Sequence, residues 1–244
     1  MGSRSSAKVT NLTDFFDALT RSPRPPHRPL VILAWAQTLD GSVAWPDGRP
    51  LAISGAASRQ FTHRLRAFCD GILVGVGAVL ADDPRLTVRE TPGDPPQPIV
   101  LDTYLRFPDR ARLLAHPRSP WLLTGPAPPP DHRQRLMAQG ARVLPQPLAA
   151  DGRVDLPAAL ATLHRRGIAT LMVEGGPTVH AAFLRAGLAD WLAVTIGPQL
   201  LGGLPALPPA RHMAPAPRLQ DGRVIPLGED LLVWGRVTSA AASA

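Results

Sequence analysis

The residues best suited to chemistry stand where apolar stretches of the chain end. Residues 70–89 begin as an apolar strand, pass two glycines, and then place the carboxylates Asp82 and Asp83 before a cation (DGILVGVGAVLADDPRLTVR). Residues 33–41 (LAWAQTLDG) and 170–179 (TLMVEGGPTV) change in the same way from apolar to polar or glycine-rich sequence. Ligands of α/β proteins bind beyond the carboxyl ends of the strands. We therefore expect these three strand ends to line one crevice.

The turn Glu174-Gly175-Gly176-Pro177 follows an apolar strand and precedes a predicted helix. Such a turn presents free backbone N–H groups at the positive end of a helix dipole, so it can bind a phosphate. Glu174 would repel a phosphate and is better suited to accept hydrogen bonds from an amine-bearing ring or from ribose hydroxyls. The alternative is an ordinary strand–helix turn with a solvated carboxylate.

Asp82 and Asp83 could be a pair of metal ligands, but neither histidine nor a further carboxylate lies at ligand spacing. We therefore expect no metal site, and Asp82 could instead cap a helix or a turn. Arg66 and Arg89 could form ion pairs with these aspartates, or they could bind the phosphate of a ligand through bidentate hydrogen bonds. The sequence leaves both interpretations open.

Several other catalytic patterns are absent from the sequence. The segment GVGAVL (75–80) starts like a dinucleotide-binding fingerprint, but Leu80 stands where the third glycine belongs. The chain has neither a GxSxG nor a CxxC motif, so nucleophilic hydrolysis and thiol chemistry have no support. His63, His164 and His180 fall within predicted helices, where we expect partly exposed rather than catalytic side chains.

Composition indicates a globular protein. Hydrophobic residues make up 45% of the 244 residues, which is ample for a buried core. No apolar stretch reaches the roughly 18 residues that span a bilayer, and the first residues lack the apolar core of a secretion signal. Cys69 is the single cysteine, so a disulfide within the chain is impossible. We expect a cytoplasmic protein that does not contact membranes.

The net charge of +7 raises the question of nucleic-acid binding. The cations are nearly all arginine, since Lys8 is the only lysine, and they are spread along the chain without a basic run. Aromatic residues amount to 5%, which leaves few surfaces for base stacking. The charge therefore does not favour nucleic acid as a partner, but it is compatible with a small polyanionic ligand.

Strands and helices alternate along most of the chain, which predicts an α/β fold with a largely parallel sheet. The first 29 residues are expected to form a tail with one short helix over 11–19, capped by Asn11 or Thr13, and a proline-rich connector over 22–29. Residues 30–244 are expected to form one domain. Its predicted strands are 30–36, 72–76, 99–101, 121–124, a segment near 143, 169–173, 191–196 and 231–237, and its helices are 56–69 (capped by Ser54), 131–140, 156–166 and 177–186.

Together these segments resemble the reductase domain of riboflavin biosynthesis, which occurs in bifunctional deaminase–reductases and in stand-alone reductases. The resemblance covers about residues 29–237, and no zinc deaminase signature accompanies it. The combination of the DDPRLTVR and EGG segments is specific, whereas either alone is weak. The matching motifs are TLDG (38–41), LRAFCDGILVGVGAVLADDPRLTVR (65–89), PIVLD (98–102), LMVEGGPTV (171–179) and IGPQLLGG (196–203).

The resemblance implies a dihydrofolate-reductase-like fold, a homodimer, and an NADPH-dependent reduction. In that reaction a hydride reaches the opened ribose carbon of a phosphoribosylaminopyrimidine and gives the ribityl product. NADPH would contact the region of residues 175–182 and several earlier positions, which gives as candidates Ala36, Ala52, Ala78, Asp82, Thr103, Gly175, Gly176, Pro177, Thr178 and Val179. A phosphorylated small-molecule substrate would contact Thr38, Asp40, Pro50, Arg66, Leu86, Arg89 and Glu174.

Within this set the resemblance places Arg66 and Arg89 at the 5′-phosphate and Glu174 at the pyrimidine or the ribose. Glu174 and Asp82 are the candidate catalytic residues. We add Arg106 to the cofactor residues, because it follows Asp102 by four positions and could reach a 2′-phosphate. The alternative for Arg106 is a solvent-facing side chain.

The chain departs from the family pattern at several expected ligand contacts. A polar residue, often lysine, is replaced by Ala34, a serine by Pro50, a tryptophan by Ala52 and a threonine by Ala78. A changed substrate is therefore an alternative, such as a pterin reduced on the same scaffold. A second alternative is a nucleotide- or nucleic-acid-binding protein without catalysis.

Overall fold

The structure, a computed structural model, describes residues 8–208 and 216–238. Within these residues ten strands form one sheet in the order β1-β11-β12-β9-β2-β8-β4-β5-β6-β7, and β3 pairs with β10 in a small second sheet. The strands are β1 (Lys8–Val9), β2 (Leu30–Thr38), β3 (Ser42–Ala44), β4 (Gly71–Gly75), β5 (Gln97–Leu101), β6 (Trp121–Thr124), β7 (Arg142–Pro145), β8 (Thr170–Val173), β9 (Trp191–Gly197), β10 (Leu204–Pro205), β11 (Arg218–Leu227) and β12 (Asp230–Thr238).

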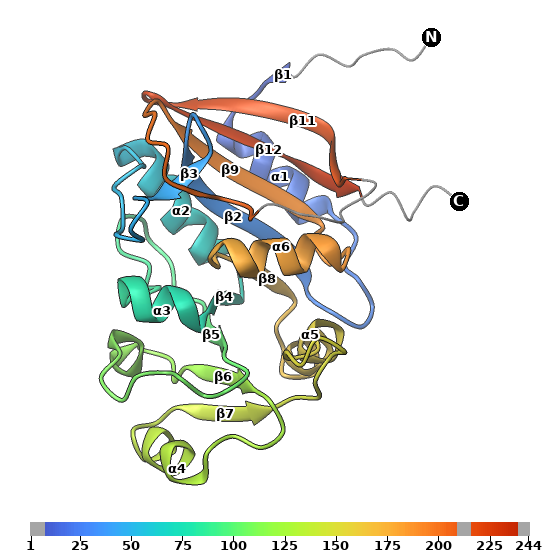
Figure 1. The fold of residues 1–244 in the computed structure, drawn as a ribbon. Coiled ribbons are helices and arrows are strands. Elements are labelled where there is room, and N and C mark those ends of the chain that lie inside the picture. Colours follow the sequence, from blue (N-terminus) through green and yellow to red (C-terminus); the bar gives the residue numbers. More distant parts are fainter. Residues whose placement is uncertain (1–7, 209–215, 239–244) are drawn as a thin grey trace.

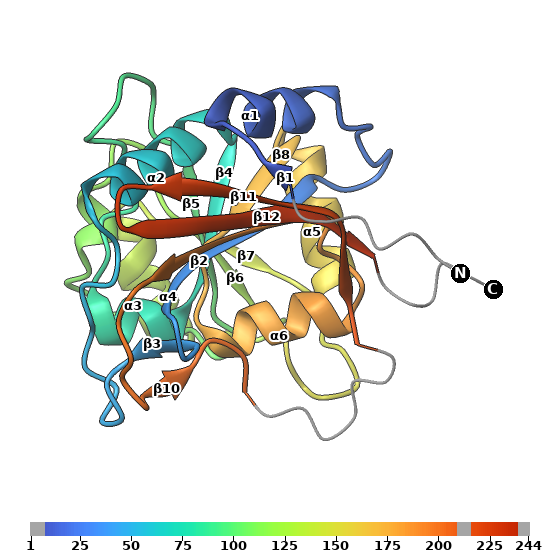
Figure 2. The ribbon, with the colours of Figure 1, turned by 90° about the horizontal axis from the view of Figure 1, so that it is seen from above.

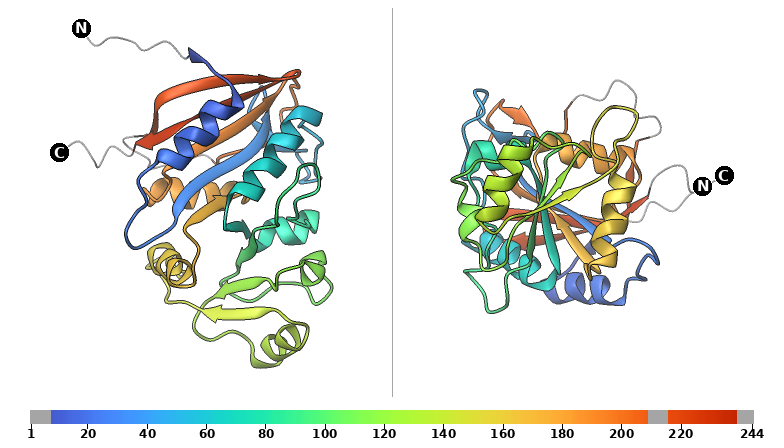
Figure 3. Two further views of the ribbon diagram at one scale, coloured as in Figure 1. Left: turned by 180° about the vertical axis from the view of Figure 1, so that it is seen from behind. Right: turned by 90° about the horizontal axis from the view of Figure 1, so that it is seen from below.

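Helices cover both faces of the large sheet (Figures 1 and 2). Side chains of α1 and α2 enter a core on one face, and side chains of α5 and α6 enter a second core on the other. Figure 3 shows α1 and α2 together on the first of these faces. The helices are α1 (Leu12–Arg21), α2 (Ala56–Phe68), α3 (Val76–Asp82), α4 (Pro130–Ala138), α5 (Leu156–Arg165) and α6 (Pro177–Arg185), with a short 3-10 helix over Arg112–Ala115.

The predicted α/β fold with a mostly parallel sheet is confirmed. Strands β2, β8, β4, β5, β6 and β7 are parallel neighbours, and β2 also runs parallel to β9. The exception is β12, which is antiparallel to both β9 and β11. Parallel strands buried on both faces read as continuous apolar runs. This explains why β4 and β8 were visible in the sequence.

The expected tail over residues 1–29 is wrong where it includes α1. Asn11 caps this helix by accepting a hydrogen bond from the Asp14 N–H at 3.0 Å. Phe15 and Leu19 are fully buried, and the Phe15 ring packs edge-on against Phe61 and Trp234. The amphipathic face of α1 is thus part of the main core, because it covers the sheet beside α2. Residues 1–7 lie outside the described residues.

Two boundaries near the predicted crevice also need correction. The cap of α2 is Gly55 rather than Ser54, and no side chain caps that helix. The predicted strand 72–76 ends at Gly75, and Val76 begins α3, a helix that the sequence analysis missed. β11 was not predicted from the sequence either, because few of its residues are buried and its pattern of apolar side chains is therefore weak.

Candidate active site

The three strand ends singled out in the sequence meet at one cavity of about 1340 Å³. Ala36 on β2, Gly75 at the end of β4 and Glu174 after β8 all line it. These strands are neighbours in the sheet and run in the same direction, so their carboxyl ends lie at the same edge. A cavity of this volume exceeds the usual range for a single small ligand and has room for two bound molecules.

Most of the sequence-predicted site residues line this cavity. From the predicted cofactor set they are Ala36, Ala52, Ala78, Asp82, Thr103, Arg106, Gly175, Gly176, Pro177, Thr178 and Val179. From the predicted substrate set they are Arg66, Arg89 and Glu174.

Four predicted substrate residues do not line the cavity. Leu86 is 2% exposed and belongs to the core, and its φ of 52° lies in the left-handed region. Thr38 and Asp40 hydrogen-bond to each other, and Asp40 also accepts hydrogen bonds from the backbone N–H groups of Leu201 and Gly202. Pro50 forms an isolated bridge with Ala44 and is exposed.

These hydrogen bonds give Thr38 and Asp40 a structural role in the turn after β2. The hydroxyl of Thr38, and then the N–H of Gly202, hold the pKa of the Asp40 carboxyl well below its usual range. The carboxylate thereby ties the turn after β2 to the loop that follows β9. Leu86 was predicted from the resemblance alone, and its side chain is buried in the core.

The N-terminus of α6 opens onto the cavity without a side-chain cap. Its N-cap residue is Gly176, and a Cβ atom built there would meet nothing within 4 Å. A Cβ atom on Gly175, by contrast, would lie 2.8 Å from the Cβ of Val179. Gly175 is therefore required by packing of the turn against α6, whereas Gly176 leaves space beside its own backbone N–H and that of Thr178, which have no hydrogen-bond partner among the described residues. Such amides bind anions.

Arg66 and Glu174 form a two-pronged ion pair across the cavity wall. Arg66 lies in the last turn of α2, and its Nε and Nη2 atoms donate to the two carboxylate oxygens of Glu174 at 2.9 and 2.6 Å. Nη1 of Arg66 donates to the carbonyl oxygen of Thr87 at 3.1 Å. The side chains of Arg66 and Glu174 are 11% and 23% exposed. This geometry fixes the orientation of the carboxylate.

The structure contradicts the ion pairs between arginines and aspartates that the sequence left open. Among the described residues, neither Arg66 nor Arg89 forms an ion pair with Asp82 or Asp83. Asp83 is the C-cap of α3, with a φ of 42°, and it accepts a hydrogen bond from the backbone N–H of Arg112 at 2.8 Å. The capping role proposed for Asp82 thus belongs to Asp83. Asp82 faces the cavity, where desolvation raises its pKa.

Replacing Arg66 by methionine is expected to lower the free energy of unfolding by about 3 kcal/mol. The change leaves the Glu174 carboxylate largely buried without its partner, and breaking such a pair costs far more than replacing both members. Urea denaturation should therefore show the double variant Arg66→Met/Glu174→Gln to be more stable than Arg66→Met alone. A double variant as unstable as the single one would argue against this pairing.

Several residues that line the cavity were not predicted from the sequence. They include Trp35, Arg59, His63, Arg153, His180 and Arg185. His63 and His180 are only 4% and 2% exposed, so the expectation of partly exposed histidines is wrong for both, although His164 is half-buried. His63 precedes Arg66 by three positions, which places both on the same side of α2. That spacing was a signal available in the sequence.

Trp35 and His180 both line the cavity and lie side by side. Their rings are 4.7 Å apart with an interplanar angle of 30°. The indole N–H of Trp35 donates to Oε1 of Gln37 at 2.8 Å. Burial lowers the pKa of His180 to about 4, so its imidazole is neutral near pH 7. This part of the cavity is thus an uncharged aromatic surface.

The described part of the chain offers no cluster of three or more histidine, cysteine, aspartate or glutamate side chains that could hold a metal ion. None of its helices combines the length and the apolar character that crossing a bilayer requires.

Comparison with known proteins finds relatives whose sequences match most of this chain. The 2,5-diamino-6-ribosylamino-4(3H)-pyrimidinone 5′-phosphate reductase of Methanothermobacter thermautotrophicus is 40% identical over 214 residues, which cover 84% of this chain and 97% of the relative. The enzyme of the same name from Archaeoglobus fulgidus is 36% identical and covers 72% of this chain and 83% of its own length.

Solved structures agree with these relatives. The riboflavin biosynthesis reductase Rib7 of Saccharomyces cerevisiae superposes with a TM-score of 0.75 at 26% identity, over 94% of this chain and all of that one. RibD of Acinetobacter baumannii has a TM-score of 0.75 at 28% identity over 93% of this chain, which spans 62% of that structure. The family described as the RibD C-terminal domain matches residues 29–233. The chain therefore belongs to the RibD C-terminal domain family, as the sequence motifs indicated.

Proposed function

We propose that this protein is an NADPH-dependent reductase that converts a phosphoribosylaminopyrimidine into its ribitylamino product in riboflavin biosynthesis. The substrate would be 2,5-diamino-6-ribosylamino-4(3H)-pyrimidinone 5′-phosphate or its 5-amino-6-(5-phosphoribosylamino)uracil counterpart. The main support is the archaeal reductase that matches this chain over 97% of its own length. The cavity at the three strand ends supplies the two kinds of surface that such a reaction needs.

One side of the cavity fits a dinucleotide. The backbone N–H groups of Gly176 and Thr178 have no hydrogen-bond partner among the described residues and can donate to a pyrophosphate, and the space beside Gly176 is open. The small side chains of Ala36, Ala52 and Ala78 leave room along the adjoining wall. When bound there, the reduced nicotinamide supplies the hydride that the opened ribose carbon accepts.

The other side of the cavity carries the groups that would orient the substrate. The Arg66 ion pair holds the Glu174 carboxylate in one orientation, and each of its oxygens retains capacity to accept a further hydrogen bond. The amino groups of the pyrimidine or the ribose hydroxyls are suitable donors. Asp82 is our second catalytic candidate, because a carboxyl group with a raised pKa is suited to proton transfer.

An assay of reduced-cofactor loss tests the proposed function. The protein is incubated with NADPH and a panel of ribosylaminopyrimidine phosphates and pterins. We expect oxidation with the pyrimidine phosphates only. Oxidation with a pterin alone would replace this proposal by the alternative that Ala34, Ala52 and Ala78 raised. Tight duplex-DNA binding with a steep salt dependence and no oxidation would favour the non-catalytic alternative.

Arg106→Ala is expected to raise KM for NADPH by roughly tenfold while changing KM for NADH little, because a charge-assisted hydrogen bond to a 2′-phosphate contributes about 1.5 kcal/mol. Arg106 and Thr103 both line the cavity, and Arg106 is exposed. Arg110→Ala is the matched control, because Arg110 is exposed in the same loop but does not line the cavity. An equal rise in KM for both cofactors would show that Arg106 does not select NADPH. Arg153 and Arg185, which also line the cavity, would then be the next candidates for the 2′-phosphate.

The homodimer and the cytoplasmic location expected from the sequence stay predictions.

A further inference from the structure

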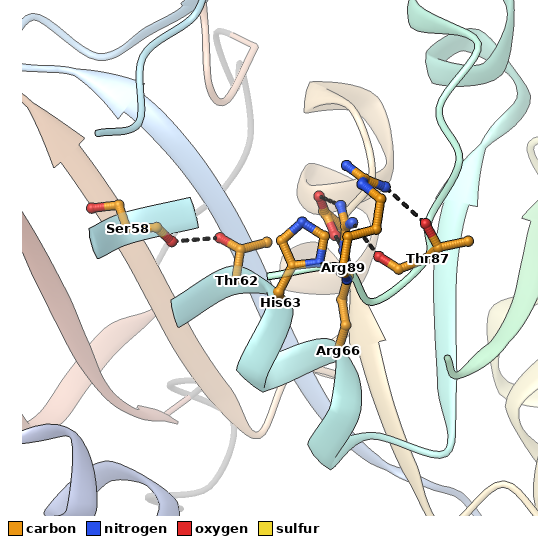
Figure 4. A network of polar contacts seen from close by, with 7 residues as sticks. Ser58, Thr62, His63, Arg66, Thr87 and Arg89 are labelled. Carbon is orange, nitrogen blue, oxygen red and sulfur yellow. Dashed lines mark hydrogen bonds and ion pairs between the residues drawn. The ribbon is translucent and has the colours of Figure 1, made fainter. Parts of the chain in front are cut away.

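His63 is a buried side chain on the cavity side of α2 that the reaction described above does not use. Its Nδ1 atom accepts a hydrogen bond from the backbone N–H of Arg89 at 3.0 Å. Figure 4 shows the imidazole between Thr62 and the two arginines, Arg66 and Arg89. Because Nδ1 is occupied as an acceptor, the proton of the neutral ring must be on Nε2.

The Nε2–H group is available to a ligand in the cavity. Within the described residues Nε2 has no hydrogen-bond partner, and it is not among the polar atoms shut off from solvent. The ring belongs to the cavity lining although only 4% of the residue is exposed. Burial lowers the pKa of His63, and the charges of Arg66 and Arg89 lower it further. The ring is thus a neutral donor held beside cations.

The two arginines near His63 differ in whether their charge is already paired with a carboxylate. Each of the three nitrogens of the Arg66 guanidinium donates one hydrogen bond, two to Glu174 and one to the carbonyl oxygen of Thr87, so the charge of Arg66 is already paired with a carboxylate. The guanidinium of Arg89 is exposed and donates to the hydroxyl of Thr87 at 2.8 Å, and no carboxylate among the described residues forms an ion pair with it. Arg59, the third cation nearby, is paired with Glu90 at 3.5 Å.

The charge that needs a partner at this end of the cavity is therefore that of Arg89. The hydrogen bond from its own backbone to His63 keeps the imidazole next to it. A phosphate fits this pair, because it has only acceptor oxygens, carries negative charge, and can be contacted by a guanidinium and a neutral N–H together. An amine or a hydroxyl-rich group would leave the Arg89 charge uncompensated.

We propose that His63 is a substrate-binding residue whose Nε2–H group, together with the Arg89 guanidinium, binds the 5′-phosphate of the sugar, while Arg66 positions Glu174. This inference rests on the proposed function for the identity of the substrate. It differs from the two-arginine phosphate site expected from the sequence, because the charge of Arg66 is already paired with Glu174 whereas that of Arg89 is not paired with a carboxylate among the described residues.

Two variants of His63 separate binding from structural support. Asparagine places an oxygen near the position of Nδ1, so His63→Asn keeps the acceptor for the Arg89 N–H but loses the donor into the cavity. Glutamine reaches as far as Nε2, so His63→Gln keeps a donor there and loses the acceptor. Calorimetric binding of ribose 5-phosphate and the melting temperature are measured for both.

We expect His63→Asn to raise the Kd of ribose 5-phosphate by about tenfold with little change in Tm. His63→Gln should bind more tightly than His63→Asn although its Tm is lower. A purely structural role of His63 predicts that affinity falls together with Tm, so that His63→Gln would bind more weakly than His63→Asn. That result would overturn the proposal. So would a loss of NADPH affinity without a loss of NADH affinity in His63→Asn, because it would assign the site to the 2′-phosphate of the cofactor.

Kinetics with the pyrimidine nucleoside and its 5′-phosphate complete the test. His63→Asn should raise KM for the phosphate and leave kcat/KM for the nucleoside nearly unchanged, and equal effects on both would contradict the inference. The binding experiment needs no turnover. Wild-type protein that binds ribose 5-phosphate through His63 but reduces no pyrimidine would thus contradict the proposed function and support the phosphate site.

Discussion

The Glu174→Gln variant is expected to turn over its substrate about a hundredfold more slowly than the wild type, which is the lower end of the effects of removing a catalytic carboxylate. Glutamine matches glutamate in size, but its NH₂ group would face one of the two Arg66 donors and accept nothing from it. The side chain would lose its fixed orientation and half of its acceptors. The readout is kcat from NADPH oxidation, measured beside the melting temperature.

Glu90→Gln is the control for this variant. Glu90 forms an ion pair with Arg59 at 3.5 Å and does not line the cavity, so the same chemical change there should leave kcat intact. A Glu174→Gln enzyme with full activity on its natural substrate would rule out both a catalytic and an orienting role for Glu174. A drop in activity that matches a drop in folded protein would do the same.

Gly176→Val is expected to weaken NADPH binding by on the order of a hundredfold. The side chain would project into open space beside the backbone N–H groups of Gly176 and Thr178, where a pyrophosphate would lie. Losing two charge-assisted hydrogen bonds at about 1.5 kcal/mol each accounts for the size of the effect. Because the backbone of Gly176 is extended and nothing lies within 4 Å of the new Cβ, the fold should lose only about 1 kcal/mol at this capping position.

Gly175→Ala gives the opposite pattern. Its new Cβ would lie 2.8 Å from Val179, so the melting temperature should fall even though the methyl group does not enter the open part of the cavity. Cofactor titrations by fluorescence, together with thermal melts, distinguish the two glycines. If Gly176→Val binds NADPH as tightly as the wild type, the N-terminus of α6 does not hold the cofactor.

The strand ends that carry the site could be predicted from the sequence because each follows a short apolar run. β4 and β8 are buried on both faces, so their residues are continuously apolar, and the glycines and charges after them stand out. The order of parallel neighbours then decides that Gly75 and Glu174 face the same cavity. Local sequence was sufficient for this part of the site.

Pairings between distant residues could not be predicted in the same way. The sequence left the partner of Arg66 open between an aspartate and a phosphate, and the structure pairs it with Glu174, which is far along the chain but adjacent in the sheet. The burial of His63 depends on a hydrogen bond to a backbone N–H, which no sequence pattern marks. The burial of α1 depends on Trp234 of β12, which is far from α1 in the sequence but packs against Phe15.

The order of strands in the sheet also constrains how this protein can fold during synthesis. β2, an early segment of the chain, lies between β8 and β9, both of which are made much later. The Phe15 ring of α1 can meet Trp234 of β12 only after more than 200 further residues have been synthesised. The nascent protein must therefore carry β2, a strand of nine mostly apolar residues, without its sheet neighbours for most of translation. Folding is then governed by contacts between distant segments, which form slowly, and the nascent chain is most exposed to aggregation before β9 and β12 arrive.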